Sequence, residues 1–339
     1  MRLVLVRLSA LGDLVHTWPL ANALRRARPK LHISWVVEHS LRSLVDGHPA
    51  VDCTLTVHTR RWRRAPFSAQ TRAETAIFRS RLLELEADLA LDIQGTLKSA
   101  WVTHASGAKE RVGLARPWRR ERLAGLVYDR TVQGSVDPPH VVATNLAAAR
   151  AVGVEPGELM APDGRWLLER GTNRPSNGSA WPPRYSVVLP GAGHSSKIVP
   201  ESVLAEVAKG LADRSVPAVV AWGPGEEARA RTVVQGAAGK AILAPPTTIL
   251  ELAHLCAGAS LVVGGDTGPI HLAASLGVAT LAVFVATDWR RNGPLGDRAA
   301  SISAAKLAET VRPNRAKALA PGAPTPREIL RRCDELLKS

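Results

Sequence analysis

Cysteine is scarce in this chain, and so are long apolar runs. The 339 residues include three cysteines, Cys53, Cys256 and Cys333. They lie far apart and match neither a metal-binding nor a redox-active spacing. No uncharged apolar run approaches the roughly 18 residues needed to span a bilayer, and early charges interrupt any signal-peptide core at the N-terminus. These absences predict a protein of a reducing compartment that is soluble or lies on a membrane surface.

Acidic residues are outnumbered by basic ones. The sequence holds 30 Asp and Glu against 44 Lys and Arg, a formal net charge of +14. An excess of this size predicts an acidic partner: nucleic acid, an anionic membrane or a phosphorylated substrate. A hydrophobic content of 45% with 22% charged residues is typical of a globular chain. The length predicts two domains, each large enough for a core.

Short apolar segments alternate with helical patterns along both halves of the chain. Strands are expected at residues 3–8, 32–37 and 87–93 in the first half, with a helix end and a strand within 49–57, and at 185–189, 217–222, 240–243, 261–263 and 279–285 in the second. Helices are expected from the loop after residue 8 to about residue 28, at 74–86 and at 249–257. The pattern predicts the α/β class, with parallel sheets in two Rossmann-like domains. We expect domains at 1–170 and 185–312, separated by a linker rich in Pro, Gly, Asn and Ser at 171–184. A tail at 313–339 ends in an amphipathic helix that could pack back on the N-terminal domain.

The segment 261–277 organises the second half. It reads as a buried strand, a glycine-rich turn and a helix that begins near Pro269, a residue favoured in a first helical turn. A helix start exposes unpaired N–H groups that suit a phosphate. Asp266 and Thr267 could bind sugar hydroxyls there, or they could simply cap the helix. One turn further in, His271 is by default a packed core histidine.

Other candidate residues also follow strands, where ligands bind in open α/β sheets. Asp13 follows the first strand and is either a helix N-cap or a general base. The sequence from Gly191 to Ser196 nearly matches the dinucleotide fingerprint, but Ser196 replaces the third glycine, which argues against a dehydrogenase. Lys197 is either a solvated lysine or a ligand of a diphosphate. Glu226 or Glu227 either binds ribose or stabilises the helix dipole.

Two arginine clusters stand out in the first half. They are Arg60-Arg61-Trp62-Arg63-Arg64 and Arg116-Pro117-Trp118-Arg119-Arg120-Glu121-Arg122. Charge runs usually form solvated faces, but arginines interleaved with Trp also suit phosphates and carboxylates. Lys98 adds a cation on the same side. The positive charge alone leaves nucleic-acid binding open as a function, although the sequence contains no recognised nucleic-acid-binding module.

Assembled, these motifs resemble the ADP-heptose:lipopolysaccharide heptosyltransferases of glycosyltransferase family 9, nearly end to end. The motifs that carry the resemblance are Ser9–Gly12–Asp13 with His16-Thr17, Trp35-Val36-Val37-Glu38, Arg60-Arg61-Trp62-Arg63, Asp92–Gln94-Gly95–Lys98-Ser99, Trp222-Gly223, and Asp266-Thr267-Gly268–His271-Leu272. The resemblance implies a GT-B fold, in which two Rossmann-like domains face each other across an interdomain cleft. It also implies inverting, metal-independent transfer of L-glycero-D-manno-heptose from ADP-heptose, without a cofactor.

The resemblance further assigns roles to residues and partners. Asp13 resembles the catalytic base. Donor contacts are expected from the C-terminal domain, at Gly193, Ser196, Lys197, Glu226, Glu227, Thr247, Asp266, Thr267, Gly268 and His271. Acceptor contacts are expected from the N-terminal domain, at Ser9, Gly12, Arg60, Arg61, Arg63, Arg64, Gln94, Lys98 and Arg120. The implied acceptor is a Kdo hydroxyl of Kdo2-lipid A, and the implied location is the cytoplasmic face of the inner membrane.

Three positions depart from the family pattern. Ile198-Val199 follows Lys197 where the family usually has Trp-Pro, Trp289 follows Thr287-Asp288 where the family has Pro, and Thr247 replaces a larger residue of the base pocket. A related transferase with a different donor or acceptor is therefore an alternative. A basic nucleic-acid-binding protein is the alternative from another class.

Overall fold

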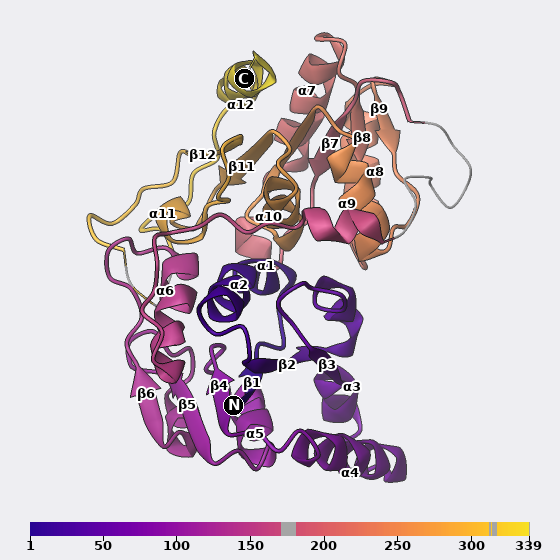
Figure 1. Cartoon of the computed structure of the whole chain (residues 1–339). Coiled ribbons are helices and arrows are strands. Elements are labelled where there is room, and N and C mark those ends of the chain that lie inside the picture. Colours follow the sequence, from indigo (N-terminus) through magenta and orange to yellow (C-terminus); the bar gives the residue numbers. More distant parts are fainter. Residues whose placement is uncertain (171–180, 312, 314–316, 339) are drawn as a thin grey trace. The chain divides into compact units, whose positions relative to one another are not determined.

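The computed structural model describes residues 1–170, 181–311, 313 and 317–338. Contacts divide the chain into two units, Met1–Met160 and Ala161–Ser339 (Figure 1). Of the linker predicted at 171–184, residues 171–180 lie outside the described residues. No described helix is both long and apolar enough to cross a membrane.

The first unit is a parallel sheet of six strands in the order β3-β2-β1-β4-β5-β6. Its strands are β1 (Arg2–Val6), β2 (His32–Glu38), β3 (Cys53–Val57), β4 (Leu89–Asp92), β5 (Glu110–Leu114) and β6 (Arg130–Val132). Its α-helices are α1 (Leu11–Val15), α2 (Trp18–Ala27), α3 (Thr59–Arg64), α4 (Ala69–Leu83), α5 (Leu97–Ala105) and α6 (Val141–Ala147). The 3-10 helices are η1 (His39–Leu44), η2 (Arg122–Val127) and η3 (Ala148–Val152).

The second unit is also a parallel six-stranded sheet, in the order β12-β11-β10-β7-β8-β9. Its strands are β7 (Ser186–Leu189), β8 (Ala218–Val220), β9 (Ala241–Leu243), β10 (Leu261–Gly265), β11 (Thr280–Phe284) and β12 (Ala299–Ser303). Its α-helices are α7 (Glu201–Ala212), α8 (Glu227–Gly236), α9 (Ile249–Ala257), α10 (Gly268–Ser275), α11 (Trp289–Asn292) and α12 (Pro326–Lys338). The 3-10 helices are η4 (Arg165–Glu169) and η5 (Ser195–Lys197).

The two sheets have the same topology. Numbered within its own unit, each has the strand order 3-2-1-4-5-6, although the sequence shows no repeat. The strand order reverses between β1 and β4 in the first unit and between β7 and β10 in the second. In open α/β sheets, ligands bind outside the carboxyl ends of strands at such a reversal. The two reversal points are therefore where a site is expected.

Apolar strands and helix faces build one core in each unit. The central strands β10 and β11 are buried along their whole length, as expected for parallel strands covered on both faces. The tail helix α12, which the sequence allowed to pack on the first domain, contacts α7 and contributes Ile329, Cys333 and Leu336 to the core of the second unit. Its amphipathic pattern is thereby explained.

Two helical segments differ from the sequence expectation. The helix expected to run to residue 28 divides into α1 and α2, with Thr17 as the N-cap of α2 and Pro19 in its first turn. The helix expected at 74–86 begins at Ala69, because the Ser68 hydroxyl accepts a hydrogen bond from the Thr71 N–H at 3.1 Å. A capping hydrogen bond thus marks the start of α4, and a proline in the first turn marks that of α2.

Candidate active site

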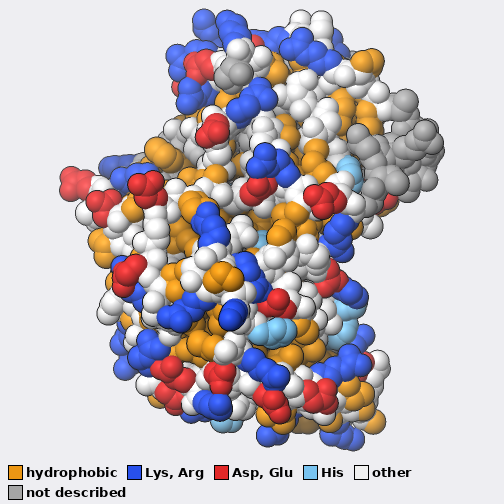
Figure 2. Space-filling view, viewed as in Figure 1, with side chains coloured by type: hydrophobic (Ala, Val, Ile, Leu, Met, Phe, Trp, Pro, Cys, Tyr) orange, Lys and Arg blue, Asp and Glu red, His pale blue; other side chains and the backbone are white. Residues whose placement is uncertain are grey.

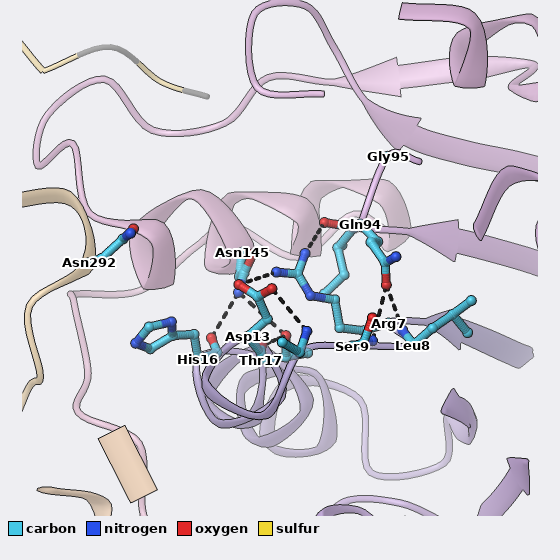
Figure 3. Close-up of polar contacts among 12 residues, drawn as sticks. Arg7, Leu8, Ser9, Asp13, His16, Thr17, Gln94, Gly95, Asn145 and Asn292 are labelled. Carbon is cyan, nitrogen blue, oxygen red and sulfur yellow. Dashed lines mark hydrogen bonds and ion pairs between the residues drawn. The ribbon is translucent and has the colours of Figure 1, made fainter. Parts of the chain in front are cut away.

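Asp13 lies at the reversal point of the first unit, in the first turn of α1. The N-cap position belongs to Ala10, so Asp13 is not the N-cap. Its Oδ2 instead accepts a hydrogen bond from the Ala10 N–H at 3.1 Å, and its Oδ1 lies 2.7 Å from a guanidinium nitrogen of Arg7 (Figure 3). About 31% of the Asp13 side chain is exposed. The carboxylate is thus held by two contacts and still reaches solvent.

Arg7 controls the charge of Asp13. The Arg7 side chain is buried, and its second terminal nitrogen donates to the Ile93 carbonyl at 2.6 Å, beyond the end of β4. Burial raises the pKa of Asp13, but the charge of Arg7, the Ala10 N–H and the charge of Arg120 outweigh that effect, so the pKa lies below its ordinary value. Asp13 is therefore ionised at neutral pH.

Gln94 joins the loop after β4 to the loop after β1. Its Oε1 accepts hydrogen bonds from the backbone N–H groups of Leu8 at 2.8 Å and Ser9 at 3.2 Å (Figure 3). The Ser9 hydroxyl in turn accepts a hydrogen bond from Lys98 Nζ at 2.8 Å. Gly12 is buried within α1 beside this loop. These contacts bring together Ser9, Gln94, Lys98 and Asp13, four residues that the sequence singled out.

Asp92 shapes the same loop from inside. It is fully buried, and its Oδ1 accepts from the N–H groups of Gln94 at 2.8 Å and Gly95 at 2.9 Å, while its Oδ2 accepts from the Tyr128 hydroxyl at 2.8 Å. Burial raises the pKa of Asp92 above its ordinary value, against these hydrogen bonds. Gly95 needs to be glycine, because its φ is +65° and an added Cβ would lie 2.8 Å from Arg119 Cγ.

The first arginine cluster divides between two surroundings. Arg60 and Arg63 lie three residues apart on α3 and line a pocket of ≈ 480 Å³ together with Lys98, Trp62 and Trp101. Burial lowers the pKa of Lys98 below its ordinary value; the charges of Arg60, Arg120 and Arg63 lower it further, against the opposing charge of Glu38. The cations therefore face one another, which suits a shared anionic group. Figure 2 shows how basic and hydrophobic side chains mix on the visible side of this unit.

The other members of the clusters are placed differently. Arg61 points away from the pocket and forms an ion pair with Glu74 at 2.6 Å. Arg64 is exposed and does not line the pocket. Arg120 is also exposed, and its charge acts on both Asp13 and Lys98. Arg60, Arg63, Lys98 and Arg120 thus act on one region, whereas Arg61 is engaged elsewhere.

In the second unit, Asp266 and Lys197 meet at the reversal point. Lys197 Nζ lies 2.7 Å from Asp266 Oδ2, and the Thr287 hydroxyl donates to the same oxygen at 2.7 Å. His271 Nε2 lies 4.0 Å from Asp266 Oδ1. Burial opposes ionisation of Asp266, but His271 and Lys197 lower its pKa far below the ordinary value. The buried, ionised carboxylate of Asp266 thus holds the ammonium group of Lys197, whose side chain is partly exposed to solvent.

The helix that follows Asp266 starts without a side-chain cap. Thr267 occupies the N-cap position of α10 in extended conformation, but its side chain makes no capping hydrogen bond, and Gly268 and Pro269 open the helix. Asp266 uses its carboxylate on Lys197 and Thr287 instead. Thr267 thus caps the helix by its position but not through its side chain, and the helix start is compatible with the ligand-binding explanation.

Two neighbouring loops complete this side of the second unit. Gly193 and Ser196 are exposed in the loop after β7, where the Ser196 N–H donates to His194 Nδ1 at 3.2 Å. Glu226 folds back over that loop. Its Oε2 accepts from the Gly223 N–H at 2.9 Å, and a Cβ at Gly191 would lie 2.1 Å from the same carboxylate. A side chain at position 191 would therefore displace the Glu226 carboxylate from its present place between the loops after β7 and β8.

The remaining donor candidates lie apart from these contacts. Glu227 forms an ion pair with Arg231 one turn along α8, at 2.6 Å. Thr247 is part-exposed and precedes Thr248, the residue that caps α9. Sequence reasoning missed three residues: it gave no role to Arg7, Asp92 or Thr287. The signal that could have found them is a charged or hydroxyl residue at or just beyond the end of an otherwise apolar strand. A polar group that is buried there needs a hydrogen-bonding partner from elsewhere in the chain.

The described residues contain no group of three or more His, Cys, Asp or Glu side chains that could hold a metal ion. Cys256 and Cys333 are buried, and burial raises the pKa of each thiol to about 12, which disfavours the reactive thiolate form.

Two Rossmann-like units with charged groups at matching reversal points define an α/β protein built from two doubly wound parallel sheets. The chain belongs to glycosyltransferase family 9 (heptosyltransferase), whose family model matches residues 76–320. Lipopolysaccharide heptosyltransferase 1 of Pseudomonas aeruginosa is 34% identical, with 87% of this chain and 82% of the relative covered. The protein of the same name from Escherichia coli is 32% identical, with 85% and 89% covered.

Solved structures agree with this membership. The E. coli heptosyltransferase WaaC with ADP has a TM-score of 0.80 at 29% identity, covering 99% of this chain and 100% of that one. The E. coli ADP-heptose lps heptosyltransferase II has a TM-score of 0.75 at 20% identity, covering 100% and 99%, and shows the fold alone. The sequence prediction of an α/β heptosyltransferase fold is thus confirmed.

Proposed function

We propose that this protein transfers L-glycero-D-manno-heptose from ADP-heptose to a Kdo hydroxyl of Kdo2-lipid A, with inversion and without a metal. The relatives named lipopolysaccharide heptosyltransferase 1 support the reaction. The similarity to a heptosyltransferase with ADP and to one with ADP-2-deoxy-2-fluoro heptose supports the donor. The observation that carries the proposal is the pair of reversal points: an ionised, solvent-reaching carboxylate at one and a lysine beside a helix start at the other.

The carboxylate of Asp13 is the general base in this mechanism. An acceptor hydroxyl attacks C1 of the heptose on the face opposite the diphosphate, and the new C–O bond forms as the bond to the diphosphate breaks. The hydroxyl proton becomes acidic as its oxygen bonds to carbon, so even a carboxylate of low pKa accepts it late in the step. The role resembles that of the water-activating base of inverting hydrolases.

Lys197 and the start of α10 receive the departing ADP. Asp266 holds Lys197 with one contact, and an ammonium group has three donors, so others stay available for diphosphate oxygens. The backbone N–H groups at Thr267 and Gly268 add partial positive charge. This electrostatic stabilisation is the role that a metal ion has in other transferases. Glu226 and the exposed loop at Gly193–Ser196 are proposed to contact the nucleoside, with Thr247 and Glu227 at its edge.

The basic pocket of the first unit is proposed to bind the acceptor. Arg60, Arg63, Lys98 and Arg120 suit the carboxylates and phosphates of a Kdo-bearing lipid A. Such an acceptor is a membrane lipid, which puts the enzyme at the cytoplasmic face of the inner membrane. The GT-B arrangement, in which donor and acceptor meet between two Rossmann-like domains at 1–170 and 185–312, is part of this proposal.

The test is ADP release from ADP-heptose in the presence of Kdo2-lipid A. Asp13→Asn keeps the size of the side chain and removes its charge, so turnover should fall by about a hundredfold or more, the scale of general-base catalysis. Asp46→Asn is the matched control, because Asp46 pairs with Arg42 at the surface and should leave turnover unchanged. Near-normal turnover of Asp13→Asn would remove Asp13 from its role.

The second candidate is a related transferase with another donor or acceptor, favoured by the departures at Ile198, Thr247 and Trp289. Comparing ADP-heptose with other nucleotide sugars in the same assay decides this question. Nucleic-acid binding predicts tight association with duplex DNA that weakens steeply with salt, which we expect to be absent.

A further inference from the structure

Large apolar side chains are exposed on one part of the first unit. Phe67 is 87% exposed, Leu123 58% and Leu126 83%, and Leu97 and Trp101 are also exposed. Leu97 and Trp101 lie one turn apart on α5, and Leu123 and Leu126 lie three residues apart on η2, where 3-10 geometry puts them on one side. Trp101 also lines the basic pocket, but the other four side chains have no part in the proposed donor or acceptor site. Their exposure therefore needs another explanation.

Contacts connect the segments that carry these side chains. Helix α5 packs against η2, and the Leu97 N–H donates to Glu121 Oε2 at 2.8 Å, beside the start of η2. Trp101 and Pro66 line the same pocket, and Phe67 follows Pro66 in the chain. Figure 1 shows α3, α4 and α5 on the same side of the first unit. We refer to Phe67, Leu97, Trp101, Leu123 and Leu126 as the α5–η2 face.

Positive charge surrounds the α5–η2 face. The segments 60–64 and 116–122 hold eight arginines and one acid, Glu121, whose carboxylate accepts the Leu97 N–H. Arg61 pairs with Glu74, and Arg119 turns inward over the Tyr128 ring. The six others have exposed side chains: Arg60, Arg63, Arg64, Arg116, Arg120 and Arg122.

We propose that the α5–η2 face docks the protein on an anionic lipid bilayer. Leucine and aromatic side chains enter the boundary between headgroups and acyl chains, while arginines around them bind anionic headgroups. Nucleic acid would use the arginines but would leave the leucines of η2 in water. This inference deepens the proposed function and rests on it, because the proposed acceptor is a lipid that the enzyme reaches at the membrane.

Vesicle co-sedimentation tests the docking. The full-length protein is mixed with phosphatidylcholine vesicles that contain or lack phosphatidylglycerol. The double variant Phe67→Ser/Leu126→Ser should bind anionic vesicles at least about tenfold more weakly, because each buried side chain strengthens partitioning by about that factor. Leu319→Ser is the matched control, since Leu319 is 66% exposed in the second unit. Unchanged binding of the double variant would overturn the proposal.

The charge contribution is tested separately. Arg116→Gln/Arg122→Gln should lose binding to anionic vesicles and depend less on salt, since exposed charges are screened. Arg331→Gln, on the exposed side of α12, is its control. If wild-type protein binds both vesicle types equally, or if the α5–η2 variants instead abolish self-association in solution, the face binds something other than an anionic bilayer.

A soluble acceptor separates the two proposals. Transfer of heptose to deacylated Kdo2-lipid A needs no membrane, so both double variants should release ADP at the wild-type rate with it. Their rate on acceptor embedded in anionic vesicles should fall in step with the lost binding. Absence of ADP release by the wild-type protein with either acceptor counts against the proposed function and leaves the vesicle result standing.

Discussion

Lys197 Nζ lies 2.7 Å from Asp266 Oδ2, and this ion pair joins the loop after β7 to the loop after β10. Gln94 has the equivalent part in the first unit, where its side-chain oxygen joins the loop after β4 to Leu8 and Ser9 after β1. Carboxyl ends of neighbouring parallel strands lie together, which makes such bridges possible. The loops that carry the candidate site residues are therefore held by side chains from the same site.

Lys197→Met should weaken ADP binding by about tenfold or more. A charged hydrogen bond contributes roughly 1.5–3 kcal/mol, and the variant also leaves the buried Asp266 charge uncompensated near the phosphates. Isothermal titration calorimetry with ADP measures the effect. Lys240→Met is the control, since Lys240 pairs with Asp213 on an exposed part of the same unit. Equal affinity of Lys197→Met and wild type would exclude Lys197 from the donor site.

Arg7→Gln should move the acidic limb of the kcat/KM profile to higher pH. Arg7 is among the groups that lower the pKa of Asp13, and burial raises it. Without Arg7 the pKa of Asp13 rises, so a larger share of Asp13 is protonated and inactive at mildly acidic pH. Arg25→Gln, which breaks the ion pair with Asp52, should leave the profile in place. A lower rate with an unshifted profile would mean that Arg7 acts only through the fold.

Arg63→Gln should raise the KM for the acceptor more than Arg61→Gln does. Arg63 lines the basic pocket with Lys98, whereas Arg61 is engaged with Glu74. The loss of one such cation beside an anionic lipid is worth about 1 kcal/mol, or about fivefold. Initial rates over a range of acceptor concentrations give both values. If Arg61→Gln has the larger effect, the acceptor binds on the Glu74 side of α3 instead.

The fold was largely predictable because each element has a local signal. Helix α9 begins and ends where the sequence predicted, since a Thr248–Glu251 capping box starts it. Helix α4 was predicted five residues late, because a run of arginines obscured its Ser68 cap. Nine strands followed from apolar runs, but β5, β6 and β12 were not predicted. The shared 3-2-1-4-5-6 order of the two sheets was not predicted either, because strand order is a long-range property.

The sequence by itself determined the class of the domains, nine of the twelve strands and the residues that follow those strands, because burial and turn chemistry act over a few neighbours. The tertiary structure alone decided which of these residues meet. It separated Arg61 from Arg63 and Glu227 from Glu226, and it paired Arg7 with Asp13 and Thr287 with Asp266. The direction in which a side chain points depends on packing between elements that are distant in the chain. It therefore cannot be predicted from the neighbouring residues in the sequence.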